Sequence, residues 1–157
     1  MIYNSGTKLA IIISKLQEMA NINNPKIFIV DDDAHCRMRY QRHLASLGFN
    51  NNLLFDNGDD CLKNLDAHPD VIFLDYDMKP LNGIDILHKV KQHNPNIHIL
   101  FISGIKDMNL AVNAIQRGAF DYIYKGDKDL DSISEAITKI LRMRQFYATL
   151  REFDLMA

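Results

Sequence analysis

The residues of this chain best suited to chemistry are aspartates that directly follow apolar runs. Asp75 comes after the run VIFL at 71–74, and Asp77 follows two positions later. An unbroken apolar run bounded by polar residues is typical of a central strand covered on both faces, as in a parallel sheet. We therefore expect Asp75 at the carboxyl end of a strand, where open α/β sheets place their ligands.

Polar residues of complementary kinds also follow the other apolar runs. They are Asp31 and Asp32 after 27–30, Ser103 after 97–102, and Lys125 after 120–124. In a parallel sheet these strand ends emerge at one edge, so residues remote in sequence should converge there. Up to four carboxylates facing one lysine would raise one another's pKa values, and a hard divalent cation would relieve their repulsion. Oxygen ligands without patterned histidine or cysteine favour Mg²⁺ over zinc.

Such a site is suited to phosphoryl transfer. A bound cation would neutralise the incoming phosphoryl oxygens while Asp75 attacks as a carboxylate nucleophile to give an acyl phosphate. Lys125 and the Ser103 hydroxyl would then hold the transferred oxygens. Few groups are needed, because catalysis of this transfer is mostly positioning and charge neutralisation.

Five predicted strands alternate with five helices, which indicates βαβ units in a three-layer α/β fold. Asp33 is a natural N-cap for a helix over 34–47, and Asn82 for a helix from Gly83 to about Gln92. Ser132-Ile133-Ser134-Glu135 fits a capping box for the final helix. An amphipathic helix over 8–20 precedes these elements.

Four segments, IVDDD, FLDYDMKPLNG, FISG and YIYKG, resemble in order and spacing the receiver domain of bacterial two-component response regulators. The resemblance covers about 25–145. It implies a flavodoxin-like, doubly wound five-stranded parallel sheet of order 2-1-3-4-5 with helices on both faces. Residues 1–24 would then form an N-terminal helical extension, and 146–157 would extend the final helix beyond the receiver domain.

The resemblance also implies a role for each site residue. Asp75 would be the phosphoacceptor, supplied by a sensor histidine kinase or a histidine phosphotransfer protein. Asp32 and Asp75 would bind Mg²⁺ through carboxylates, Asp77 through its backbone carbonyl, and Asp31 mainly through water. Lys125 would pair with the phosphoryl oxygens.

Two further residues would form the family's switch. Ser103 would move toward the phosphoryl group, and the ring of Tyr122 would then turn inward. An unknown downstream protein would read the surface made by the last two helices and the strand between them. From the residues alone, Ser103 could instead cap the helix that follows it, and Tyr122 could be a partly buried sheet residue.

The chain departs from the family at two places. The family usually has proline after the lysine, joined by a cis peptide, whereas this chain has Gly126. A cis bond to a non-proline residue costs about 3 kcal/mol, so we predict a rearranged loop with a trans bond. Pro80, after Lys79, is one place later than usual, and this loop's shape is left open.

Bulk properties narrow the possible partners. The net charge of −2 (18 basic against 20 acidic residues) provides no basic excess for nucleic acid. No stretch approaches the ~18 apolar residues of a membrane span, and the N-terminus lacks signal-peptide features, so we expect a cytoplasmic protein. Cys36 and Cys61 are expected to be reduced thiols.

The two ends of the chain carry apolar stripes with two interpretations. The helix at 8–20 either packs back on its own domain or forms a dimer contact. The final helix continues an apolar stripe past residue 145, beyond the sheet. That continuation is either a coiled-coil-like homodimer seam or a surface for residues 8–20. The full stripe comprises Ile133, Ala136, Ile140, Met143, Tyr147 and Leu150.

Three functions compete. The first is a phosphoacceptor switch, which is not an enzyme in the usual sense but assists its own phosphorylation and dephosphorylation. The second is a degenerate receiver that acts as an interaction scaffold, which the full set of site residues disfavours. The third is a small haloacid-dehalogenase-like phosphatase; that family places its DxDx[TV] motif on the first strand, whereas DYDM here lies on the third.

Overall fold

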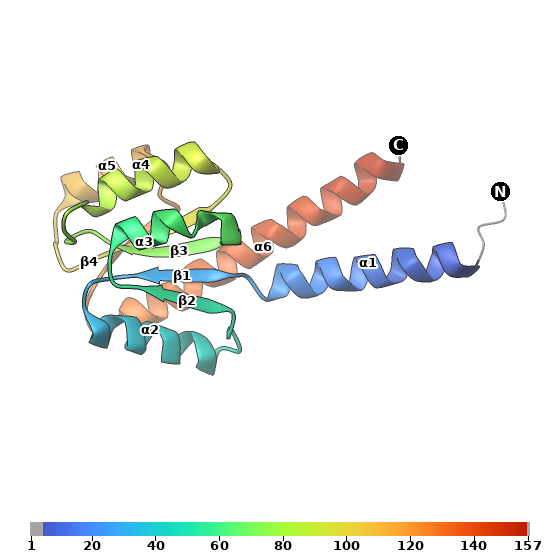
Figure 1. Ribbon diagram of the computed structural model, residues 1–157, viewed down its shortest axis with the longest axis horizontal. Coiled ribbons are helices and arrows are strands. Elements are labelled where there is room, and N and C mark those ends of the chain that lie inside the picture. Colours follow the sequence, from blue (N-terminus) through green and yellow to red (C-terminus); the bar gives the residue numbers. More distant parts are fainter. Residues whose placement is uncertain (1–4, 157) are drawn as a thin grey trace.

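The computed structural model describes residues 5–156. Five parallel strands form one sheet of order β2-β1-β3-β4-β5, as predicted (Figure 1). The strands are β1 (Ile27–Val30), β2 (Asn52–Phe55), β3 (Val71–Asp75), β4 (His98–Ser103) and β5 (Asp121–Tyr124). Val30 pairs with Leu74 and Ser103 pairs with Tyr124, so the residues that follow β1, β3, β4 and β5 meet at one edge.

Helices cover both faces of the sheet. They are α2 (Ala34–Ser46), α3 (Gly58–Lys63), α4 (Gly83–His93), α5 (Met108–Gln116) and α6 (Asp129–Met156), with a short 3-10 helix, η1, at Leu65–Ala67. Alternate residues of the central strands face opposite ways, because side chains in a strand have a period of two. Phe28 and Ile72 pack against α3, α4 and α5, whereas Ile29 and Phe73 pack against α2 and α6.

The predicted caps hold for two helices and fail for one. Asp33 accepts a hydrogen bond from the His35 N–H, and Asn82 accepts one from the Asp85 N–H. The final helix, however, begins at Asp129, and Ser132 lies inside its first turn with its N–H donating to the Lys128 carbonyl. The capping-box prediction was therefore wrong: the helix begins one turn earlier, where α2 side chains bind Asp129.

Helix α1 (Ser5–Asn23) and the distal half of α6 extend away from the sheet at the same end of the domain (Figure 1). Residues 6–21 are all exposed, so α1 does not pack back on the domain. It lies beside α6 instead, with Lys15 Nζ 3.4 Å from Glu152 Oε1 and Gln145 Nε2 2.9 Å from Asn23 Oδ1. No helix within residues 5–156 is both long and apolar enough to cross a bilayer.

Candidate functional site

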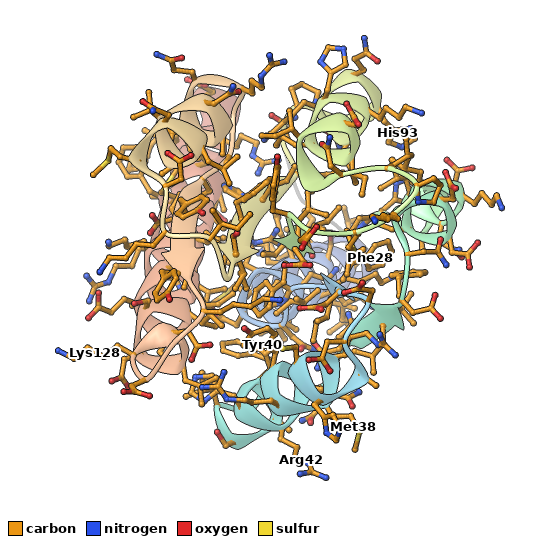
Figure 2. The ribbon with its side chains drawn as sticks, turned by 90° about the vertical axis from the view of Figure 1, so that its left-hand side faces the viewer. Phe28, Met38, Tyr40, Arg42, His93 and Lys128 are labelled. Atoms are coloured by element: carbon orange, nitrogen blue, oxygen red, sulfur yellow. The ribbon has the colours of Figure 1, made fainter. Side chains whose placement is uncertain are left out.

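The carboxyl edge of the sheet brings together the acidic and basic residues singled out in the sequence; Figure 2 looks toward this edge. Lys125, directly after β5, places its Nζ 2.7 Å from Asp31 Oδ2 and 2.9 Å from Asp75 Oδ1. One carboxylate oxygen from each of Asp31, Asp32 and Asp75 lies within 4.8 Å of the other two. Residues separated by up to 94 positions therefore form one charged cluster.

The cluster combines buried and open carboxylates. Asp31 and Asp75 are 2% and 5% exposed, whereas Asp32 is exposed. Burial raises the pKa of Asp75; the hydrogen bond from Lys125 opposes that rise, and the nearby charge of Asp31 adds to it. Burial alone would lower the pKa of Lys125, but hydrogen bonds to Asp31 and Asp75 outweigh it, so this pKa is raised. The lysine is therefore a permanent cation at neutral pH.

Asp31 and Asp32 differ in the number of hydrogen bonds that they accept from the rest of the protein. Asp31 Oδ1 accepts the Asp33 N–H at 2.9 Å, its Oδ2 accepts Lys125, and its carbonyl accepts Arg37 at 2.6 Å. The Asp32 carboxylate accepts no hydrogen bond from residues 5–156 and faces solvent. Asp32 is thus the carboxylate most available to an incoming cation.

Ser103 and Tyr122 are connected through one residue, Ile105. The buried Ser103 Oγ accepts the Ile105 N–H at 3.0 Å, and the Tyr122 hydroxyl donates to the Ile105 carbonyl at 2.5 Å. The Tyr122 ring is half-buried and stacks on Phe101, with ring centroids 5.8 Å apart. Ser103 does not cap a helix, because α5 begins at Met108 with Asp107 as its N-cap.

The two loops where the sequence departs from the family have different backbones. The only cis peptide among the described residues is Lys79–Pro80. The Lys125–Gly126 bond is trans, as predicted. Asp77 lies in the exposed segment that follows β3, and its carboxylate is outside the cluster of three.

Sequence reasoning missed Gly83, which supports the site, and Asp129, a buried aspartate outside it. A Cβ on Gly83 would lie 2.6 Å from the Asp75 carbonyl oxygen, so the start of α4 packs directly on the backbone of the strand end. Asp129 is 1% exposed and accepts both terminal nitrogens of Arg39, at 2.5 and 2.6 Å. The position of Gly83 beside a cap was a usable signal; Asp129 stood in a polar run, GDKDLD, that looked like surface.

The donor set fits a hard divalent cation. Three carboxylates face one lysine, which leaves the cluster with excess negative charge, and every available ligand atom is an oxygen. Mg²⁺ is usually bound by one or two carboxylates together with water and phosphate oxygens. Asp32 and Asp75 meet that requirement, with Asp31 beside them.

Comparisons with known proteins agree with this geometry. The chain is 34% identical over 122 residues to the DNA-binding transcriptional regulator NtrC of Salmonella typhimurium, which covers 77% of the chain and 25% of that protein. It is 29% identical over 120 residues to the luminescence regulatory protein LuxO of Vibrio campbellii, which covers 74% of the chain and 26% of that protein. The chain thus spans about a quarter of the length of these relatives.

Solved structures share the fold. NtrX from Brucella abortus, in complex with ADP, superposes with a TM-score of 0.74 at 26% identity, over 83% of this chain and 30% of NtrX. The signal receiver domain of a LuxO repressor protein from Vibrio parahaemolyticus superposes with a TM-score of 0.73 at 20% identity, over 81% of this chain and 97% of that one. The family model of the response regulator receiver domain matches residues 27–146, and the chain therefore belongs to the response regulator receiver domain family.

Proposed function

We propose that this chain is a phosphorylation-controlled switch in two-component signalling, with Asp75 as the phosphoacceptor. The observation that carries the proposal is the buried Asp75 carboxylate at the end of β3, 2.9 Å from Lys125 and clustered with Asp31 and Asp32. The phosphoryl donor would be the phosphohistidine of a sensor histidine kinase or of a histidine phosphotransfer protein.

The transfer forms one bond and breaks one. A carboxylate oxygen of Asp75 bonds to phosphorus while the P–N bond of the phosphohistidine breaks, and the electron pair stays on the imidazole nitrogen, which takes up a proton. Burial keeps Asp75 more basic than an exposed aspartate, which favours attack. Lys125 holds its ammonium beside Asp75, where it would pair with phosphoryl oxygens after transfer.

The same cluster would hold Mg²⁺. Asp32 and Asp75 would bind it through carboxylates, Asp77 through its backbone carbonyl, and Asp31 mainly through water, because Asp33 and Lys125 already bind the oxygens of Asp31. When bound, the cation supplies charge neutralisation for the phosphoryl oxygens. Asp31 would also hold the Lys125 ammonium group in place before and after phosphoryl transfer.

Ser103 and Tyr122 would transmit the change. A phosphoryl group on Asp75 would offer the Ser103 hydroxyl an acceptor, in competition with its bond to the Ile105 N–H. Because Tyr122 donates to the carbonyl of the same Ile105, movement of this loop would also release the tyrosine ring. The affected surface, formed by α5, β5 and α6, exposes Met108 and Tyr124 to a downstream protein.

The decisive experiment is intact mass measurement after incubation with acetyl phosphate and Mg²⁺. The wild-type chain should gain one labile phosphoryl group, and Asp75→Asn should gain none. Asp33→Asn is the matched control: it is a neighbouring acidic residue whose capping role an asparagine fills equally well, so labelling should persist.

Other outcomes favour other functions. Absence of an adduct on the wild-type chain would contradict the proposal and favour a degenerate receiver that acts as a scaffold. Sustained hydrolysis of p-nitrophenyl phosphate would favour a phosphatase of the haloacid dehalogenase kind. The partners of the switch would be the phosphoryl donor, a downstream protein and, through the terminal helices, a second copy of the chain.

A further inference from the structure

The two terminal helices carry apolar stripes with the same spacing. On α1 the stripe is Leu9, Ile12, Leu16 and Met19; on the distal half of α6 it is Met143, Phe146, Leu150 and Phe153. Both stripes step by three, four and three residues, the 3.5-residue period of a coiled-coil or helix-bundle seam. All eight side chains are between 38% and 66% exposed. Met143 and Leu150 line a hollow between α6 and the domain, and Met19 lines the contact between the two helices.

Of the two stripes, only Met19 lines the contact between α1 and α6. The bonds across this contact are polar: the Lys15–Glu152 ion pair and the hydrogen bond from Gln145 to Asn23. A third contact runs from Arg144 to the Asn21 carbonyl, at 3.3 Å. The contacts run outward along both helices, from 145 to 152 on α6 and from 23 to 15 on α1, so the two helices are antiparallel neighbours.

Helix geometry places the α1 stripe, together with Phe146 and Phe153 of α6, on one side of this pair. Lys15 and Ile22 of α1 face α6, and Gln145 and Glu152 of α6 face α1. At 100° per residue, Leu16 lies about 100° around α1 from Lys15, and Phe153 lies about 100° around α6 from Glu152. Because the helices are antiparallel, these two rotations lead to the same side, where the α1 stripe forms one apolar surface with Phe146 and Phe153. Met143 and Leu150 lie about 160° around α6 from Gln145 and Glu152, and they line the hollow between α6 and the domain instead.

We propose that a second copy of this chain covers that surface, giving a four-helix bundle of two α1 and two α6 helices about a two-fold axis. This inference is independent of phosphorylation, because it rests on the terminal helices alone. A two-fold axis suits the surface, since an isologous contact places the same patch of each copy against the other. Antiparallel neighbours packed as a second layer on an identical pair give the ordinary four-helix bundle.

The exposed area reaches the lower limit of what a stable dimer needs. Large apolar side chains that are about half exposed offer roughly 100 Å² each, so the six on this side offer on the order of 600 Å² per copy, the low end of the area per partner in specific interfaces. The polar sides of the helices argue against a membrane as the occupant. Glu18, Glu152 and Asp154 equal Lys8, Lys15 and Arg151 in number, and Arg144 pairs with Asp70, whereas surface-binding helices are rich in Lys and Arg on the polar face.

The test is the oligomeric state of the full chain, measured by light scattering and sedimentation from about 1 to about 100 µM. We expect a dimer. The double variant Leu16→Glu/Phe153→Glu would bury four charges in the bundle and should raise the dimer dissociation constant at least ~100-fold. A second double variant, Ile12→Ser/Phe146→Ser, removes apolar area without adding charge and should weaken the dimer in the same direction.

Two matched controls separate this surface from others. Gln17→Glu adds a charge to an exposed part of α1 outside the stripe and should leave the dimer intact. Met108→Glu adds a charge to α5, where Met108 is 77% exposed, and should also leave the dimer intact. Asp75→Asn should dimerise like the wild type, so failure of the phosphorylation proposal and failure of this one can be told apart.

The substituted side chains are exposed in the single copy, so the receiver fold should survive in every variant, and circular dichroism can check this. A wild-type chain that stays monomeric throughout the concentration range would overturn the proposal, as would binding of that monomer to anionic vesicles. A dimer that Met108→Glu disrupts and Leu16→Glu/Phe153→Glu does not would also overturn it and assign the contact to α5.

Discussion

Two buried aspartates near the ends of the same sheet, Asp75 and Asp129, each face a cation, yet their pKa values move in opposite directions. Asp129 accepts both terminal nitrogens of Arg39 and the Tyr40 hydroxyl at 3.2 Å. Burial would raise the pKa of Asp129, but the hydrogen bonds and charge of Arg39 lower it below its ordinary value. Tyr40 donates this bond from α2, where its side chain lies between the helix and the sheet (Figure 2).

The difference is one of charge balance. Asp129 has one positive partner to itself and three donors, so its negative charge is neutralised within the fold. Asp75 shares Lys125 with Asp31, and Asp32 adds another negative charge beside them. The first arrangement stabilises the fold and needs nothing more, whereas the second leaves negative charge that a bound cation can neutralise. A pair of buried carboxylates can therefore be sorted into structural and functional by counting the cations that face each one.

The largest effect on stability is expected when the negative charges of Asp129 and Asp75 are removed in turn. Asp129→Asn leaves Arg39 without its buried partner and should lower the free energy of unfolding by about 3 kcal/mol, at the low end for broken buried pairs because Arg39 is partly exposed. Asp75→Asn removes one of three clustered negative charges while Lys125 keeps Asp31, so it should leave stability unchanged or raise it by up to about 1 kcal/mol.

Urea unfolding at neutral pH without divalent cations measures both variants. Asp131→Asn, which replaces an exposed acidic residue in the same helical turn, controls for changes in helix charge. If Asp75→Asn destabilised the chain as much as Asp129→Asn, the distinction between the two aspartates would be wrong.

The pH dependence of the Asp129 pair follows from the direction of its pKa shift. A carboxyl group whose pKa is lowered by folding contributes stability that is present above its unfolded pKa and lost as the pH falls through its folded pKa. The stability gap between the wild type and Asp129→Asn should therefore be constant from about pH 8 to about pH 5 and close below about pH 4. A gap that instead closed on going from neutral to alkaline pH would show that the Arg39–Asp129 ion pair is not its source.

The close packing of the backbone beside Asp75 provides a further test. Asp75 has Gly83 against its carbonyl, and a Cβ there would also lie 2.9 Å from Tyr76 Cα. Gly83→Ala must shift this backbone, so we expect a loss of about 2 kcal/mol in unfolding free energy together with slower labelling by acetyl phosphate. Gly104→Ala is the matched control, because no heavy atom lies within 4 Å of its added Cβ. Equal losses in the two variants would argue against a packing cause.

The sequence predicted the sheet and the charged cluster because both depend on strong, local signals. Apolar runs that stop at Asp31, Asp75, Ser103 and Lys125 mark strand ends, and the topology of a parallel sheet brings strand ends together. The start of α6 could not be predicted in the same way. Asp129, the first residue of the helix, binds Arg39, 90 residues earlier, and such a contact leaves no trace in the local pattern.

The direction of α1 could not be predicted from the sequence either. Its apolar spacing predicts a helix with an apolar side, but the same spacing suits packing on the domain, on α6 or on another chain. What places α1 beside α6 is a set of long-range polar contacts from Gln145 and Arg144, which are themselves ordinary surface residues in sequence. Arg144 also binds Asp70, just before β3, and so joins α6 to the edge of the sheet from which it extends.

The smallest expected effect is the stabilisation by Mg²⁺, which tests whether the excess negative charge of the cluster binds a cation. If the Asp31–Asp32–Asp75 cluster binds Mg²⁺ only in the folded state, Mg²⁺ at tenfold its dissociation constant should stabilise the wild type by about 1.4 kcal/mol. Asp32→Asn, which removes the one carboxylate of the cluster that is open to solvent, should lose most of that gain. Asp33→Asn should keep it, because Asp33 caps α2 and lies outside the cluster. Thermal unfolding with and without Mg²⁺, with EDTA as the metal-free reference, measures the difference. Equal gains in Asp32→Asn and the wild type would show that the cation binds elsewhere and that charge excess does not mark this site.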